Sequence, residues 1–165
     1  MELSSWLPII GWTIPAMGWY VANKQANERE LRKEVRSEVE DVIELVDKIL
    51  ESLKEYLALD GSNDKALGLA LEIRYLFKRL DTLIHILTER ERYSFDEFTT
   101  TKLLNMNEVV IESSKFFELC TGGDFGDIDK QSLEANDLVS TWLRASLPAH
   151  ELINKLHGQF ITAFK

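Results

Sequence analysis

Apolar residues recur through the first half of the chain at the spacing of α-helices. Between residues 23 and 59 they follow a heptad pattern of the coiled-coil kind, and turn-forming residues interrupt it at positions 60–63. A second heptad pattern runs from residue 63 to about residue 92. Two matched seams joined by a short turn predict a long antiparallel helical hairpin, in which Gly61 takes a left-handed cap conformation. The first seam is Val35, Val39, Val42, Val46, Ile49, Leu53 and Tyr56, and the second is Ala66, Leu69, Ile73, Leu76, Leu80, Leu83 and Leu87.

Three shorter helices are expected after the hairpin, over residues 94–165. Ser94 and Glu97 match a capping box, which predicts a third helix from Ser94 to Cys120. Apolar residues between positions 133 and 143 predict a fourth helix, and Pro148 fits the first turn of a fifth. No stretch alternates with period two for long enough to predict a strand. Residues 24–165 are therefore expected to form one all-α helical bundle domain.

The first two dozen residues differ in kind, because residues 3–23 contain no charged side chain. A charge at the centre of a bilayer costs about 3 kcal/mol, so a charge-free run of this length is typical of a membrane segment. Trp6 at one end, and Trp19 and Tyr20 at the other, fit the interfacial zones where aromatic rings anchor such helices. The run is short, since residues 6–22 reach roughly 25 Å as a helix against about 30 Å of hydrocarbon. We expect a single transmembrane helix within residues 1–23.

Two other interpretations of this segment fit less well. A cleaved signal peptide requires a basic start and a cleavage site of the A-x-A type, and the sequence offers neither. A helix on the membrane surface requires a polar face, which the run lacks. The orientation follows from Lys24, Arg29, Arg32, Lys33 and Arg36, which come directly after the run. We therefore expect a short outer N-terminus and a cytoplasmic C-terminal domain, in a bacterial inner membrane.

A stripe of small residues runs along the predicted membrane helix. Gly11, Pro15, Gly18 and Ala22 are spaced four, three and four residues apart, which places them on one face. Small residues let the backbones of two membrane helices approach closely, so this face is a candidate contact with another helix. The alternative is that glycine and proline are simply common in membrane helices.

Composition agrees with a cytosolic helical body. The 165 residues carry a net charge of −9, which argues against non-specific binding to nucleic acid. The single cysteine, Cys120, excludes an internal disulfide, fits a reducing compartment and is most simply a small core residue.

Two groups of potential metal ligands stand out in the second half of the chain. Asp124, Asp127 and Asp129 share a glycine-containing loop, but they do not match the EF-hand pattern and are more typical of helix caps. His150 and His157 lie seven residues apart without a third ligand nearby in the sequence. We therefore expect neither a metal nor a cofactor.

Two stretches match the pattern R-x5-H, namely Arg79 with His85 and Arg144 with His150. This pattern resembles the R-x4-6-H element of HEPN ribonucleases, which are small helical bundles with the motif near the start of a late helix. The resemblance implies metal-independent RNA cleavage by the arginine and the histidine, often across a dimer. In that family a polar residue usually follows the arginine, whereas here the residue is apolar in both matches. The structural alternative is a histidine on a solvated helix face.

We expect the protein to act by assembly rather than by catalysis. It would be either an accessory or scaffold subunit of a membrane complex, or an oligomerising effector whose clustered spans perturb the bilayer. Its partners would be the membrane and other protein subunits, through self-association or a membrane protein complex, with no nucleic acid. The enzyme alternative is a HEPN-like, metal-independent ribonuclease tethered to the membrane.

Overall fold

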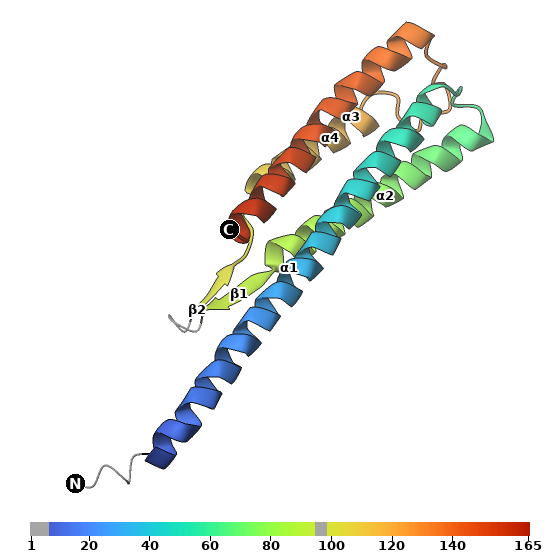
Figure 1. Cartoon of the computed structure of the whole chain (residues 1–165). Coiled ribbons are helices and arrows are strands. Elements are labelled where there is room, and N and C mark those ends of the chain that lie inside the picture. The colour runs from blue at the N-terminus through green and yellow to red at the C-terminus, as the bar shows by residue number, and fades with distance from the viewer. Residues whose placement is uncertain (1–6, 95–98) are drawn as a thin grey trace. The chain divides into compact units, whose positions relative to one another are not determined.

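The computed structural model describes the backbone of residues 7–94 and 99–165, and the side-chain surroundings of residues 15, 17–92 and 99–165. This part of the chain is mostly helical, which confirms the all-α class (Figure 1). The helices are α1 (Leu7–Leu57), α2 (Asp64–Glu89), α3 (Asn107–Thr121) and α4 (Ala135–Ala163), and the strands are β1 (Glu91–Ser94) and β2 (Thr99–Lys102).

The chain divides into two compact units, Met1–Arg36 and Ser37–Lys165. Helix α1 contributes to both, and the predicted anchor, residues 1–23, falls in the first unit. The second unit contains the remainder of α1 together with α2, α3, α4 and the two strands.

Within the second unit the helices alternate in direction along the chain, so that α1 and α2 form the predicted antiparallel hairpin (Figure 1). Among the described residues, three ion pairs join α1 to α2 and its C-cap residue. They show the antiparallel arrangement, because partners later in α1 pair with residues earlier in α2. The outermost pair is bidentate, since the Arg90 guanidinium just after α2 donates to both carboxylate oxygens of Glu38. The three pairs are Glu38 with Arg90, Lys48 with Glu72, and Glu55 with Lys65.

The core of the second unit includes the faces that the heptad seams predict. The first seam is buried from Val39 to Tyr56, and the second seam is buried from Ala66 to Leu80. Beyond Leu80 the buried position shifts from the predicted Leu83 to Ile84 and then continues at Leu87. A straight helix drifts by about 20° per heptad relative to a strict seven-residue repeat, and this drift accounts for the shift.

A β-hairpin replaces the start of the predicted third helix. Strands β1 and β2 pair antiparallel with Glu91 opposite Lys102 and Ser94 opposite Thr99. The prediction of no strand and of a capping box at Ser94 was therefore wrong, and α3 begins only at Asn107. Three successive threonines at 99–101 favour extended backbone, because their branched Cβ atoms restrict helical rotamers.

The predicted fourth and fifth helices are one continuous helix, α4, with Pro148 inside it. Proline removes one backbone hydrogen bond and costs about 3 kcal/mol in a helix interior. Tertiary contacts on both sides of Pro148 offset this cost. Before it, the Trp142 indole N–H donates to the backbone oxygen of Leu50 on α1 at 3.1 Å. At and after it, the Pro148 ring, Leu152 and Leu156 are buried.

The connection between α3 and α4 is fastened to the end of the α1–α2 hairpin. The Gly61 N–H donates to the Lys130 oxygen at 2.7 Å, and the Leu133 N–H donates to the Leu57 oxygen at 3.2 Å. A Cβ atom on Gly61 would lie 2.1 Å from the Asp127 oxygen, so no side chain fits there. Close approach is thus what requires this glycine. Among the described glycines, Gly123 and Gly126 have positive φ and Gly61 does not, so the predicted left-handed cap at Gly61 was wrong.

Leu80→Ala should destabilise the bundle strongly, because Leu80 is 0% exposed and truncation leaves a cavity. We expect a loss of about 2–5 kcal/mol in the free energy of unfolding, measured by chemical denaturation. Leu71→Ala in the same helix is the matched control, because Leu71 is 59% exposed and should change stability by less than about 0.5 kcal/mol. Equal losses for both variants would contradict the assignment of the core face of α2.

Asp60→Asn should make the bundle less stable at neutral pH and less sensitive to acid. The hydrogen bond from the Ser132 backbone N–H, 2.7 Å from the carboxylate, lowers the pKa of Asp60 below its ordinary value of 3.8, with smaller help from the Ser132 hydroxyl and the Lys130 charge. A carboxylate with a lowered pKa stabilises the fold above its ordinary pKa, and that contribution is lost as the pH falls through the lowered value. The difference in unfolding free energy between wild type and variant should therefore shrink below about pH 3.8. A difference between wild type and Asp60→Asn that stays constant as the pH falls would show that the Ser132 contact does not lower the pKa of Asp60.

Candidate functional site

The two arginine–histidine pairs do not converge within one copy of the chain. Arg144 and His150 both lie inside the uninterrupted helix α4, and six residues at about 100° each leave them roughly 120° apart around the axis. Arg79 and His85 have the same relation within α2, and both side chains are exposed. The helix start that the HEPN resemblance requires near His150 is absent from the described chain, since α4 begins at Ala135.

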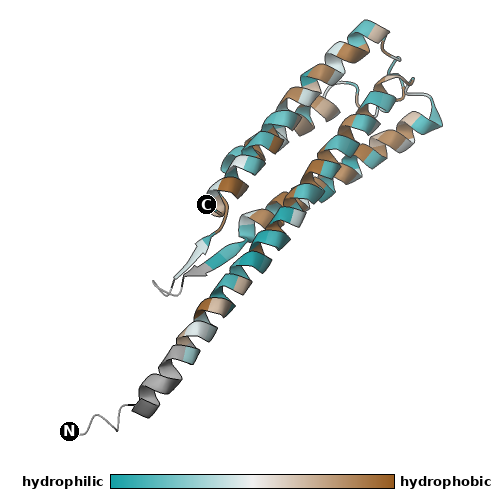
Figure 2. Cartoon of the chain, viewed as in Figure 1, coloured by the Kyte–Doolittle hydropathy of each residue, from teal (hydrophilic) through white to brown (hydrophobic). Residues whose placement is uncertain are grey.

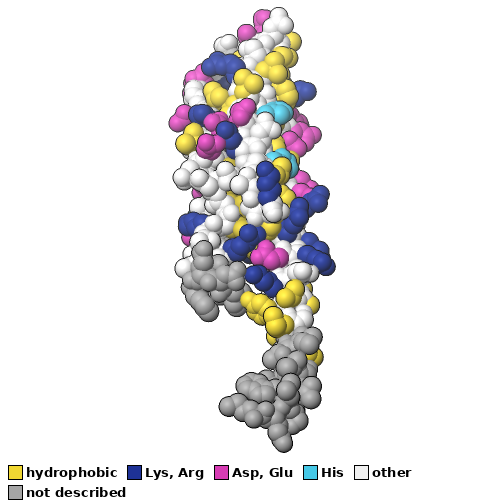
Figure 3. All heavy atoms as spheres, turned by 60° about the vertical axis from the view of Figure 1, so that its left-hand side comes forward, with side chains coloured by type: hydrophobic (Ala, Val, Ile, Leu, Met, Phe, Trp, Pro, Cys, Tyr) yellow, Lys and Arg dark blue, Asp and Glu magenta, His cyan; other side chains and the backbone are white. Residues whose placement is uncertain are grey.

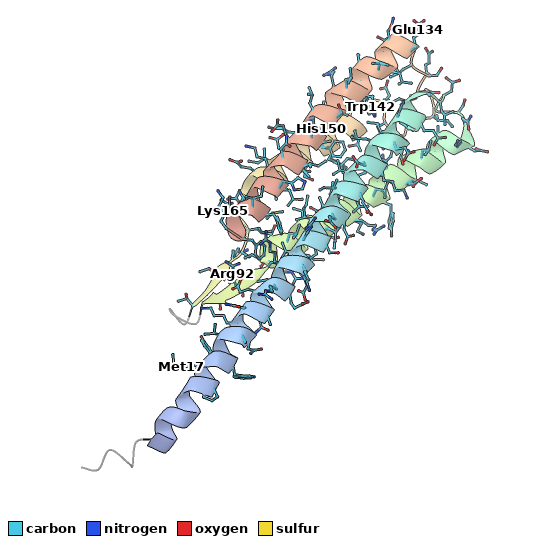
Figure 4. The ribbon with its side chains drawn as sticks, viewed as in Figure 1. Met17, Arg92, Glu134, Trp142, His150 and Lys165 are labelled. Atoms are coloured by element: carbon cyan, nitrogen blue, oxygen red, sulfur yellow. The ribbon has the colours of Figure 1, made fainter. Side chains whose placement is uncertain are left out.

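His150 itself has an ordinary structural role in α4. It lies about midway along the helix, between Trp142 and Lys165 (Figure 4), and its Nδ1 atom is 2.7 Å from the Ser146 backbone oxygen. Because that oxygen can only accept, Nδ1 carries a proton in this arrangement. Ser146 lies one helical turn before His150, so this contact fixes the orientation of the ring within its own helix. It does not bring the ring close to any other group of the described residues that could take part in proton transfer.

The acidic loop after α3 builds turns rather than an ion site. The Asp127 carboxylate accepts a hydrogen bond from the Asp129 N–H at 3.1 Å, and the Asp127 N–H donates to the Asp124 oxygen at 3.0 Å. Among the residues that the structure describes, no three His, Cys, Asp or Glu side chains are placed to hold a metal ion. Neither the aspartate loop nor the pair of His150 and His157 belongs to such a group among the described residues.

A cleft of about 590 Å³ lies where the α3–α4 connection meets the end of α1, and it contains Cys120 and Lys130. The Lys130 ammonium donates to the backbone oxygens of Tyr56 and Leu59 and lies 4.8 Å from the centre of the Tyr56 ring. A cation there is favourable, because the carbonyl groups at and just after the C-terminus of α1 point toward it at the negative end of the helix dipole. Burial raises the pKa of the Cys120 thiol to about 12, which makes it unreactive at neutral pH. Both groups thus serve the fold.

The first unit exposes apolar side chains on α1 directly before Lys24. Trp19 is 71% exposed and Met17 is 69% exposed, with Tyr20 and Val21 also on the surface. Hydropathy changes along the helix at this point, from apolar residues to the charged run that follows (Figure 2). Figure 3 shows these hydrophobic side chains as a group beside the part of the chain that is not described.

The small-residue stripe lies on the same stretch of α1. Pro15, Gly18 and Ala22 are exposed, and a Cβ atom added to Gly18 would meet nothing within 4 Å. Gly11 belongs to α1, but its surroundings lie outside the described part, and Trp6 precedes the described residues altogether. The stripe is therefore uncovered where the structure describes it.

Within the described residues, the structure contains no helix that is both long enough and apolar enough to cross a membrane.

The heptad seam of α1 is occupied within the chain itself. Val39, Val42, Val46, Ile49 and Leu53 are all buried in the second unit. This part of the seam cannot also hold the corresponding seam of another copy. Any assembly of the second unit must therefore use other faces of the helices.

Several such faces carry exposed apolar residues, which is unusual when they form groups rather than single positions. They occur on three helices of the second unit: Leu67, Leu71, Tyr75 and Ile86 on α2, Val110, Ile111, Phe117 and Leu119 on α3, and Val139, Leu143, Leu147 and Ile161 on α4.

Two grooves accompany these residues. One, of about 640 Å³, lies between α2 and α3 and has Phe77 and Phe117 among its lining residues, with ring centres 5.1 Å apart. The other, of about 540 Å³, lies between α3 and α4 and has Leu119, Leu147 and Pro148 among its apolar residues. Sequence analysis did not identify either groove, because it assigned one apolar face to each helix. The signal was available on α4, where Val139, Leu143 and Leu147 recur at four-residue spacing outside the buried set.

Comparison of the chain with models of protein families, with curated proteins and with solved structures finds no match.

His150→Ala should leave both stability and function nearly unchanged, because the ring makes one contact within its own helix. We expect a change of less than about 0.5 kcal/mol in unfolding free energy, and the same for His85→Ala. The purified protein should not cleave single-stranded RNA in the presence of a chelator. Metal-independent cleavage that His150→Ala abolishes without altering the melting temperature would establish the ribonuclease instead.

Proposed function

We propose that this protein is a single-pass, membrane-anchored helical protein that acts by assembly. The observation that carries the proposal is the exposed apolar surface of α1 before Lys24, with Trp19 and Met17 about 70% exposed. Burying apolar surface contributes about 25 cal/mol per Å², so uncovered side chains of this size favour a lipid or protein environment. They continue a segment, residues 3–23, that carries no charge.

The identity of the exposed residues supports a position at the membrane interface. Tryptophan and tyrosine combine a large apolar ring with one polar atom, and they are enriched at the boundary between hydrocarbon and water. Trp19 and Tyr20 occupy the last turn of the charge-free run, and Lys24 follows one turn later. Apolar residues, then aromatic residues and then a lysine are the order expected for a helix that passes from the hydrocarbon through the headgroup region into water.

The charged part of the first unit supports a cytoplasmic location for the second unit. Five lysine and arginine residues fall within residues 24–36, and the positive-inside rule counts these residues almost independently of interleaved acids. Lys33, for example, pairs with Glu30 at 2.9 Å while remaining exposed.

The second unit supports assembly as the mode of action. Its seam residues are buried within the chain, and its outer faces carry groups of exposed apolar residues. Groups of exposed apolar residues are typical of surfaces that bind other proteins, ligands or membranes. Two forms of assembly are consistent with these features: a subunit that recruits partners to a membrane complex, and an effector that oligomerises and perturbs the bilayer.

The full-length chain should sediment with membranes and resist extraction at alkaline pH, because an inserted apolar helix is not released by disrupting ionic contacts. Deleting residues 1–23 should move the protein to the supernatant with its helical circular dichroism retained. A full-length chain that remains in the supernatant without detergent would refute the membrane proposal, whatever its state of association.

Gly18→Leu should weaken association through the membrane helix if the stripe is a contact face. Loss of close packing between membrane helices costs on the order of 1–2 kcal/mol, which lowers the association constant about tenfold. Val21→Leu, which enlarges an exposed apolar residue off the stripe, is the matched control. The measurement is cross-linking yield in native membranes. Equal yields for wild type and both variants would mean that the stripe reflects ordinary membrane-helix composition.

A further inference from the structure

The groove between α3 and α4 is the most distinctive surface of the second unit. Leu147 on α4 is 68% exposed and lies beside Leu119 of α3 and Pro148 along an apolar strip. Charged residues complete the lining: Glu112, Lys115, Glu118, Arg144 and Glu151. With three carboxylates and two cations, the lining is close to neutral, in contrast to the chain as a whole with its net charge of −9.

Arg144, Glu151 and Glu118 line this groove without forming an ion pair among the described residues. Lys115 pairs with Glu112 at 2.7 Å, and Lys155 on α4 pairs with Glu108 at 2.9 Å. Arg144 and Glu151 form no ion pair with any residue in the described ranges.

The spacing of these two charges matters, because they are too far apart to pair with each other. Arg144 and Glu151 are seven residues apart, two turns along one face of α4, which corresponds to about 10.5 Å along the axis. Leu147 lies between them on the same side of the helix, at the apolar strip of the groove.

This pattern is self-complementary under a two-fold rotation perpendicular to α4. An antiparallel second copy of α4 reverses the order of the charges, so Arg144 of each copy faces Glu151 of the other. The same rotation brings the two Leu147 side chains to the axis, each over the apolar strip of the opposite groove. One operation thereby pairs Arg144 and Glu151 and covers the exposed leucine.

We propose that the α3–α4 groove binds a second copy of this chain in an antiparallel, two-fold arrangement. A second copy fits better than an unrelated partner, because the surface carries both signs of charge in an order that complements itself. A near-neutral face is also where two molecules of net charge −9 approach with least repulsion. The interface rests on the proposed assembly function and specifies its self-associating form, but it does not require a membrane.

Charge exchange at positions 144 and 151 tests the arrangement in the full-length protein. Arg144→Glu alone places two carboxylates opposite each other at both ends of the interface, and Glu151→Arg alone places two guanidinium groups there. Each variant should therefore lose self-association by about tenfold or more, measured by co-purification of two differently tagged copies. When one tagged copy carries Arg144→Glu and the other carries Glu151→Arg, both ends regain opposite charges, and co-purification should return to within about twofold of wild type.

Matched controls separate this effect from a general change in charge. Lys78→Glu and Asp81→Arg make the same two changes of charge on α2, outside the α3–α4 groove, and both should co-purify as well as wild type. If the groove variants also co-purify normally, the interface is wrong while self-assembly stands. If each variant loses association and the mixture does not recover, the two residues matter for association but do not face each other, and the two-fold proposal is overturned. If wild-type copies do not co-purify at all, the self-associating form of the proposed function fails together with the interface.

Discussion

Burial of the α1 seam against its own chain is the constraint on which the second unit depends. Val39, Val42, Val46, Ile49 and Leu53 are removed from water, and each buried side chain of this size contributes about 1.5–3 kcal/mol. The ion pairs of Lys48 and Lys65 help to orient α1 and α2 but contribute little stability, because both lysine side chains are exposed. The bidentate pair of Glu38 and Arg90 is the exception, being partly buried at the end of α2 where the chain turns into the β-hairpin.

This use of the seam has a consequence for function. A heptad helix suggests association between chains, yet here the seam is satisfied inside one chain. The association proposed for this protein would therefore use surfaces that the heptads do not predict, above all the α3–α4 groove with its exposed Leu147 and with Arg144 and Glu151. The apolar surface of α1 before Lys24 is a separate surface with a different chemistry, because aromatic rings at the end of a charge-free run suit a membrane interface.

The sequence could predict those features that depend on local periodicity. The helical class, the hairpin of α1 and α2 and most of their buried faces follow from the heptad spacing, apart from the drift that replaces Leu83 by Ile84. Features that depend on tertiary contacts could not be predicted. Pro148 stays inside α4 because its ring is buried and Trp142 binds α1, and neither contact is visible in the sequence.

The β-hairpin and the groove show two further limits. The run of threonines at 99–101 is too short to show a period-two pattern. The capping box at Ser94 therefore led to the prediction of a helix there instead of a strand. The self-complementary charges needed the knowledge that Leu119 of α3 lies beside Leu147 of α4, which only the packed structure supplies. For the membrane segment, the charge-free run identified the candidate, and the structure adds the exposure of the residues at its end.

The central claim is that the protein works as an assembly held at a membrane. The most direct measurement is the mass of the protein particle extracted gently from native membranes, obtained by native mass spectrometry of the full-length chain. The account predicts that the chain is recovered from the membrane fraction in a particle with at least two copies or with a defined partner. A chain recovered as a lone monomer from the membrane-free fraction would contradict it.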